Sequence, residues 1–68
     1  MRLSARNQLK GTVVSIVRGP VTALVKIDVG GQHLSATLTA EACDELGLVE
    51  GKETVAIFKA SAVILGVE

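Results

Sequence analysis

Three short segments of this chain combine side chains that could bind a small anion. Ser4-Ala5-Arg6-Asn7-Gln8 brings together a hydroxyl, a guanidinium and two amides, all of which can donate hydrogen bonds. Lys59-Ala60-Ser61 adds an ammonium group and a second hydroxyl. Thr39 precedes a predicted helix, whose first N–H groups are unpaired and lie at the positive end of the helix dipole. These segments predict a site for a small oxyanion, unless Arg6 and Lys59 pair with surface acids and Thr39 only caps the helix.

The other reactive side chains form no enzyme signature. His33 is the single histidine and lies on the polar face of a predicted strand, where a solvated imidazole is expected. Cys43 has neither a second cysteine nor an adjacent histidine, so we expect a small buried residue of a reducing compartment. The acids Glu41, Asp44 and Glu45 share one short helix and are interpreted as its solvated face. We therefore expect a binding protein without catalytic residues and without a metal-cation site.

Composition indicates one domain, residues 1–68, that associates with other copies. The chain has 68 residues and is 49% hydrophobic, with Phe58 as its one aromatic side chain. A domain of about 60 residues hides only about 60% of its unfolded surface when it folds alone. Soluble monomers rarely expose large apolar patches. The surplus of Val, Leu, Ala and Ile therefore predicts an oligomer.

Charge and hydropathy exclude several classes of partner. Seven basic and seven acidic residues give a net charge of zero, whereas nucleic-acid-binding domains usually carry a basic face. A base-stacking module also needs several aromatic platforms, so a nucleic-acid-binding module is a weaker alternative. No apolar run approaches the length of a membrane span, and the first seven residues lack an apolar signal core. We expect a cytoplasmic protein that binds neither nucleic acid nor membrane.

The predicted elements that would position these segments are strands and one short helix. Thr22–Val29 and Gln32–Thr39 alternate apolar and polar residues around Gly30-Gly31, which is typical of a hairpin. Leu9–Arg18 carries apolar groups on both faces and is predicted to be buried on two sides. The remaining predicted elements are a helix over Ala40–Gly47 and strands over Thr54–Ala60 and Ala62–Val67. Five strands with a helix between the third and fourth predict an all-β, OB-like small β-barrel.

The sequence resembles the molbindins, small bacterial molybdate- and tungstate-binding proteins of the Mop type. The resemblance rests on Ser4-Ala5-Arg6-Asn7-Gln8-Leu9 followed by Gly11, on Gly19-Pro20-Val21-Thr22, on Leu46-Gly47-Leu48 with Glu50-Gly51, and on Lys59-Ala60-Ser61. It covers essentially the whole chain. It implies an OB-like barrel whose protomers exchange strands and assemble as a hexamer, a trimer of dimers, with molybdate or tungstate held at subunit interfaces.

The same resemblance assigns oxyanion-binding residues. The expected contacts fall on Ser4, Ala5 and Arg6, on Thr39 and the start of the following helix, and on Lys59, Ala60 and Ser61. Some relatives carry a serine at the position of Ala42, which here offers only its backbone N–H. A second class of site is placed near Gly19, Pro20, Val21 and Thr22. A purely structural oligomerisation module without an oxyanion site is the remaining alternative.

Overall fold

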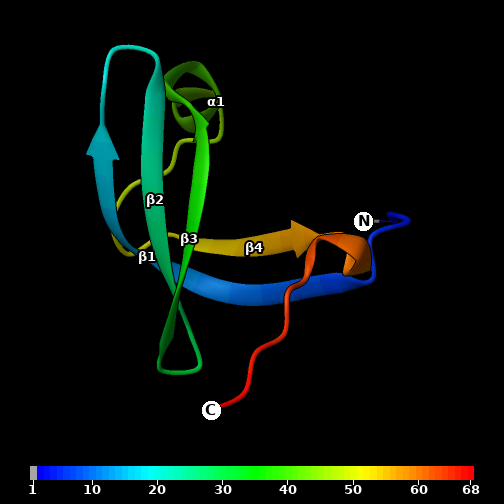
Figure 1. Cartoon of the computed structure of the whole chain (residues 1–68). Helices are drawn as coiled ribbons and strands as arrows, with labels where there is room; N and C mark the ends of the chain where they lie inside the picture. The colour runs from blue at the N-terminus through cyan, green and yellow to red at the C-terminus, as the bar shows by residue number, and fades with distance from the viewer. Residues whose placement is uncertain (1) are drawn as a thin grey trace.

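The computed structural model describes residues 2–68, in which strands predominate over a single short α-helix (Figure 1). This confirms the predicted all-β class with one helix. The elements are the strands β1 (Asn7–Arg18), β2 (Thr22–Val29), β3 (Gln32–Thr39) and β4 (Glu53–Phe58), the helix α1 (Ala40–Glu45) and the 3-10 turn η1 (Ala60–Ala62). Gly30 and Gly31 adopt φ angles of 59° and 90° in the turn between β2 and β3, which confirms the predicted hairpin.

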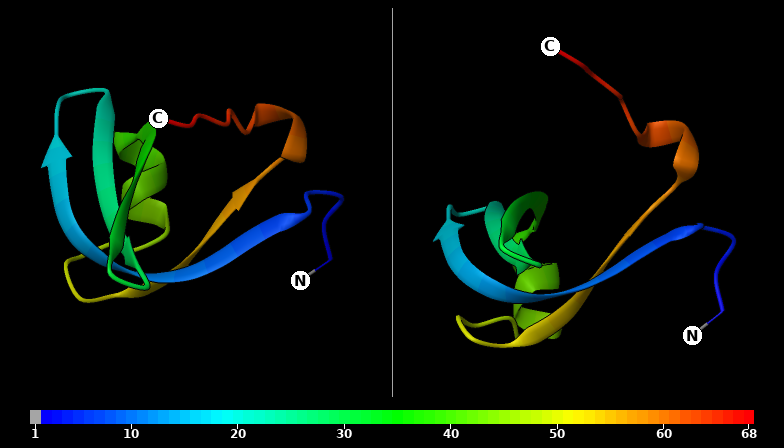
Figure 2. Two further views of the ribbon diagram at one scale, coloured as in Figure 1. Left: turned by 60° about the horizontal axis from the view of Figure 1, so that its bottom comes forward. Right: turned by 90° about the horizontal axis from the view of Figure 1, so that it is seen from below.

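The long strand β1 connects two parts of one antiparallel sheet, whose order is β3-β2-β1-β4. The first half of β1 pairs with β4, from Asn7↔Phe58 to Thr12↔Glu53. The second half pairs with β2 and ends at Arg18↔Ala23. The register shifts between Val13 and Ser15, and such a bulge bends the strand that carries it. Figure 2 shows β1 curving from its partner β4 to its partner β2.

The core lies on the concave side of this sheet, where α1 covers it. Its buried members are Val13, Ala23, Val25, Ile27 and Cys43. The inward face predicted for β2 and the predicted burial of Cys43 are thereby confirmed. The prediction that β1 is buried on both faces is wrong for the single chain, because Val14 and Val17 are 36% and 64% exposed. Within residues 2–68, no second layer covers their side of the sheet.

The segment predicted as a fifth strand, Ala62–Val67, has a different structure. Ala62 ends η1, and residues 63–68 adopt no regular secondary structure. Ile64, Leu65 and Val67 are 94%, 89% and 100% exposed. Their composition suits a strand, but η1 turns the segment away from the sheet, so it pairs with neither edge strand, β3 nor β4 (Figure 2). The four-stranded sheet is therefore open and does not close into a barrel within one chain.

Gly11 allows β1 and β2 to approach closely, and its replacement tests this contact. A Cβ atom at Gly11 would lie 2.7 Å from the Asp28 carbonyl oxygen and 3.0 Å from a Val29 methyl group. We expect Gly11→Ala to lower the free energy of unfolding by about 1–3 kcal/mol, because a backbone carbonyl cannot move aside cheaply. Denaturant titration measures the change. Gly19→Ala is the control, since its nearest neighbour would lie at 3.5 Å; an equal loss in both variants would contradict the steric explanation.

Candidate functional site

The two predicted segments at the ends of the chain lie together. Asn7, the first residue of β1, pairs with Phe58, the last residue of β4. Arg6, just before β1, and Lys59, just after β4, are therefore next to the same end of this strand pair. Figure 1 shows the N-terminal segment beside η1 at this end. We call this group the arginine-lysine end; it consists of Ser4, Ala5, Arg6, Lys59, Ala60 and Ser61. All but Ala5 are exposed, so their donors are open to a ligand.

The other predicted residues lie at the opposite end of β1. Thr39 pairs with Thr22, and the Ala40 N–H donates to the Val21 carbonyl at 2.7 Å. The Ala42 N–H donates to Thr39 Oγ1 at 3.0 Å, which confirms Thr39 as the N-cap of α1. In this structure the N–H group that Ala42 was expected to offer to an oxyanion is therefore occupied by Thr39. We call this group the threonine end; it consists of Gly19, Pro20, Val21, Thr22, Thr39 and Ala42. The loop assigned to a second site is thus a direct neighbour of Thr39.

One chain does not bring the two ends together. The 12 residues of β1 lie between them along the chain, and Figure 1 shows the N-terminal segment and η1 at one end of this curved strand and α1 near the other. A hydrogen bond spans only about 3 Å, so one small anion cannot touch both ends of the same molecule. The residues predicted to form one oxyanion site therefore lie in two separate groups of the chain, which we call half-sites.

Two cations at α1 were not singled out by the sequence. Arg18 donates from Nη2 to Asp44 Oδ1 at 2.7 Å, and its Nη1 lies 3.5 Å from the Cys43 sulfur. Lys52 Nζ donates to the carbonyl oxygens of Leu46 and Gly47 at 3.1 and 3.3 Å. Both cations hold the C-terminal turn of α1, where positive charge is favourable. The partners of Arg18 are 25 and 26 positions away, so no local pattern could have indicated them; those of Lys52 are only five and six positions away, in the loop that follows α1.

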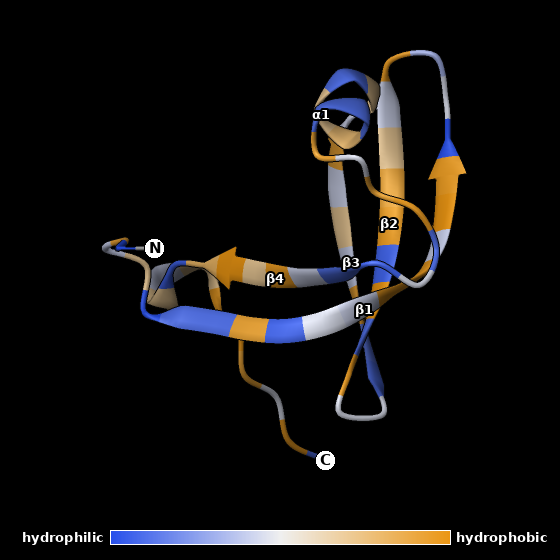
Figure 3. Ribbon diagram, turned by 180° about the vertical axis from the view of Figure 1, so that it is seen from behind, coloured by the Kyte–Doolittle hydropathy of each residue, from blue (hydrophilic) through white to orange (hydrophobic). Residues whose placement is uncertain are grey.

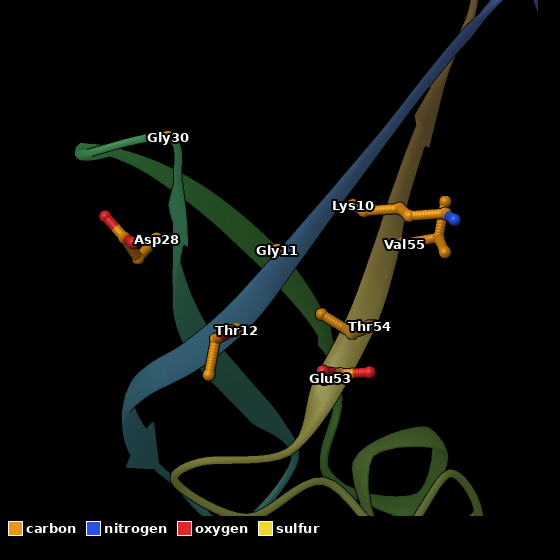
Figure 4. Close-up of a pocket in the computed structure, with 8 residues that line it drawn as sticks. All are labelled: Lys10, Gly11, Thr12, Asp28, Gly30, Glu53, Thr54 and Val55. Atoms are coloured by element: carbon orange, nitrogen blue, oxygen red, sulfur yellow. The ribbon is translucent and has the colours of Figure 1, made fainter.

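A hollow of about 460 Å³ over Gly11 does not have the chemistry of an anion site. Figure 4 shows its lining, in which Lys10 points away from Asp28 and the polar side chains do not converge. Asp28 and Glu53 contribute carboxylates to it, and carboxylates repel a dianion. The hollow is therefore separate from both half-sites.

A larger groove of about 580 Å³ lies on the same face of the sheet as the core. Its lining is mostly apolar and includes Val25, Ile27, Leu34, Leu38, Ala56, Phe58 and Val63. Figure 3 shows that apolar residues also continue along the C-terminal segment. The chain thus exposes both an apolar groove and an apolar extended segment.

Among residues 2–68, no helix has the length and apolar character that crossing a membrane requires.

Comparisons with known proteins agree on one family. Residues 3–65 match the TOBE domain family. The chain is 56% identical to a probable molybdenum-pterin-binding protein from Haemophilus influenzae, over 100% of both chains. Its structure is similar to a molybdate-binding protein from Sporomusa ovata, with a TM-score of 0.93 and 36% identity over 98% of this chain and 100% of that one.

A further structural relative was solved with its ligand. This is the cytoplasmic molybdate-binding protein ModG in a molybdate-bound form, with a TM-score of 0.95 and 49% identity over 100% of this chain and 49% of the ModG chain. The family match and the full-length relative together settle the classification. The chain belongs to the TOBE domain family, among the small molybdenum-pterin-binding proteins known as molbindins.

Proposed function

We propose that this chain binds molybdate, and tungstate in the same way, at sites formed between subunits. The main support for this proposal is the similarity to ModG with molybdate bound, at 49% identity and a TM-score of 0.95. We further propose that the chain is a single binding domain, that it acts in the cytoplasm as ModG does, that its role is storage or homeostasis of the oxyanion, and that it is not an enzyme.

The chemistry of the two half-sites supports a fully deprotonated dianion as the ligand. Arg6 and Lys59 supply positive charge, while Ser4, Ser61 and Thr39 supply hydroxyl donors. None of the residues assigned to the two ends carries a carboxylate, which would repel such an anion; Glu41, in the first turn of α1, is the acid next to Ala42 along the chain. Hydrogen bonds to a charged group contribute about 1.5–3 kcal/mol each. A few such bonds from fixed donors would hold the anion and select its size.

A second copy of the chain would complete the site. We propose that the arginine-lysine end of one subunit meets the threonine end of another, which the length of β1 prevents within one chain. We also propose that the C-terminal segment of one subunit occupies the apolar groove of its partner and adds the fifth strand of an OB-like barrel. Strand exchange of this kind, repeated in a trimer of dimers, would give the hexamer that the resemblance to molbindins implies.

A purely structural oligomerisation module is the second candidate, favoured by the apolar groove and the exposed C-terminal segment. Thermal unfolding with added anions separates the two candidates. A ligand that binds only the folded assembly stabilises it by about 2.7 kcal/mol per site at 100 times its dissociation constant. We expect molybdate and tungstate to raise the melting temperature clearly, and equal concentrations of sulfate to raise it little.

Sulfate is the matched control because it carries the same two negative charges in a smaller tetrahedron. Fixed donors set a cavity radius, so selectivity follows from geometry. Thr39→Val should lose part of the molybdate effect, since it removes one donor. Equal shifts with all three anions would indicate a general anion patch. No shift with any of them would support the structural module.

A further inference from the structure

Lys52 is joined to Thr39 by a continuous series of hydrogen bonds along α1. At one end, Lys52 Nζ donates to the Leu46 carbonyl at 3.1 Å. The Leu46 carbonyl and the Gly47 N–H belong to one peptide unit, and this N–H donates to the Asp44 carbonyl at 3.0 Å. The Asp44 carbonyl in turn shares a peptide unit with the Glu45 N–H. In the α-helix this N–H donates to the Glu41 carbonyl.

The series ends on a side chain of the proposed oxyanion site. The peptide unit of the Glu41 carbonyl carries the Ala42 N–H, which donates to Thr39 Oγ1 at 3.0 Å. Hydrogen bonds that share peptide units polarise one another. A positive charge on the Leu46 carbonyl therefore strengthens each bond in the series, including the one that Thr39 accepts.

The hydrogen bond from the Ala42 N–H constrains the Thr39 hydroxyl. Its oxygen accepts from the Ala42 N–H, so its single proton remains to be donated elsewhere. Thr39 is exposed, and an outward proton would point to a ligand. A hydroxyl that accepts a stronger hydrogen bond is itself a better donor, because the two bonds are cooperative.

The helix needs such support because it is short. α1 spans six residues, well below the length at which an isolated helix is stable. Cys43 is its one buried residue, so packing holds only the middle of the helix. Lys52 binds the carbonyls of the C-cap residue, Leu46, and of Gly47, which follows it.

We infer that Lys52 is a positioning residue for the oxyanion site, acting through α1 on the Thr39 hydroxyl of the same chain. The inference rests on the proposed molybdate binding. Lys52 itself contacts two backbone carbonyls that lie at the far end of the helix from Thr39. Its effect on the ligand is therefore indirect and must vanish when the Thr39 hydroxyl is absent.

A double-mutant cycle tests this dependence in the full-length assembled protein. Titration calorimetry with molybdate is carried out on the parent, Lys52→Met, Thr39→Val and the double variant. We expect Lys52→Met to weaken binding roughly two- to fivefold in the parent and to have no further effect in the Thr39→Val background. Lys52→Arg should restore the parental affinity, because a guanidinium can reach the same carbonyls.

Lys26→Met is the matched control, since Lys26 is an exposed lysine of β2 outside both half-sites; it should change binding in neither background. Light scattering checks that all variants keep the same assembly. Equal losses from Lys52→Met with and without the Thr39 hydroxyl would overturn the inference, because a general loss of structure adds to other losses. So would a parental affinity in Thr39→Val, which would leave molybdate binding itself intact. If the parent fails to bind molybdate, the proposed function and the inference both fall.

Discussion

Replacing Arg6 or Lys59 by alanine is expected to weaken molybdate binding by about 2–5 kcal/mol, or about 30- to 4000-fold in the dissociation constant. These two residues are the cations of the arginine-lysine end, held together by the pairing of Asn7 with Phe58. A dianion that enters a protein interface loses its water, and removing one cation leaves part of its charge unpaired. Much of the expected loss comes from that unpaired charge.

Titration calorimetry at constant ionic strength measures the molybdate affinity of both variants. The control is Lys26→Ala, which removes an exposed cation of β2 that belongs to neither the arginine-lysine end nor the threonine end. Arg6→Lys adds information, because it keeps the charge but loses the planar fork of donors; we expect its loss to be smaller than that of Arg6→Ala. Parental affinity in both alanine variants, together with a loss in Lys26→Ala, would mean that the site lies elsewhere on the molecule.

Local features of the fold were predictable because neighbouring residues determine them. The alternation on either side of Gly30-Gly31 gave the hairpin, and Thr39 marked the start of α1. Features that depend on pairing partners were not predictable in the same way. The bulge of β1 between Val13 and Ser15 follows from how that strand changes partners. The segment Ala62–Val67 has the composition of a strand, but η1 turns it away from the edge strands β3 and β4.

For the candidate site, too, local features were predictable and the arrangement in space was not. Each donor segment could be recognised because its residues are adjacent in sequence. Their arrangement could not, because it depends on β1: the strand joins Arg6 to Lys59 at one end and separates both from Thr39. The contact of Arg18 with Asp44 was also missed, since the two residues are 26 positions apart and no sequence pattern links them. The contacts of Lys52 with Leu46 and Gly47 are close in sequence, but they depend on how the loop after α1 folds back.

The second large effect is expected from a substitution in the C-terminal segment, which should prevent the subunits from assembling. Ile64, Leu65 and Val67 are 94%, 89% and 100% exposed in the single chain. Full burial of such a side chain contributes about 1.5–3 kcal/mol, so the three together can contribute about 5–9 kcal/mol per subunit. We expect Leu65→Asp to abolish assembly, because it removes one of these contributions and places a carboxylate in an apolar groove, where an unpaired charge is very costly.

Size-exclusion chromatography with light scattering compares Leu65→Asp with Glu68→Gln, which alters a charge in the same segment without changing its apolar residues. The parent and Glu68→Gln should elute as an assembly larger than a dimer, and Leu65→Asp as the 7.0 kDa chain. An assembled Leu65→Asp variant would show that the segment does not occupy the groove, and a monomeric parent at micromolar concentration would contradict assembly altogether. Loss of assembly must also remove molybdate binding, because the arginine-lysine end and the threonine end of one chain lie at opposite ends of β1. A monomeric Leu65→Asp variant that still bound molybdate with parental affinity would show that one half-site suffices.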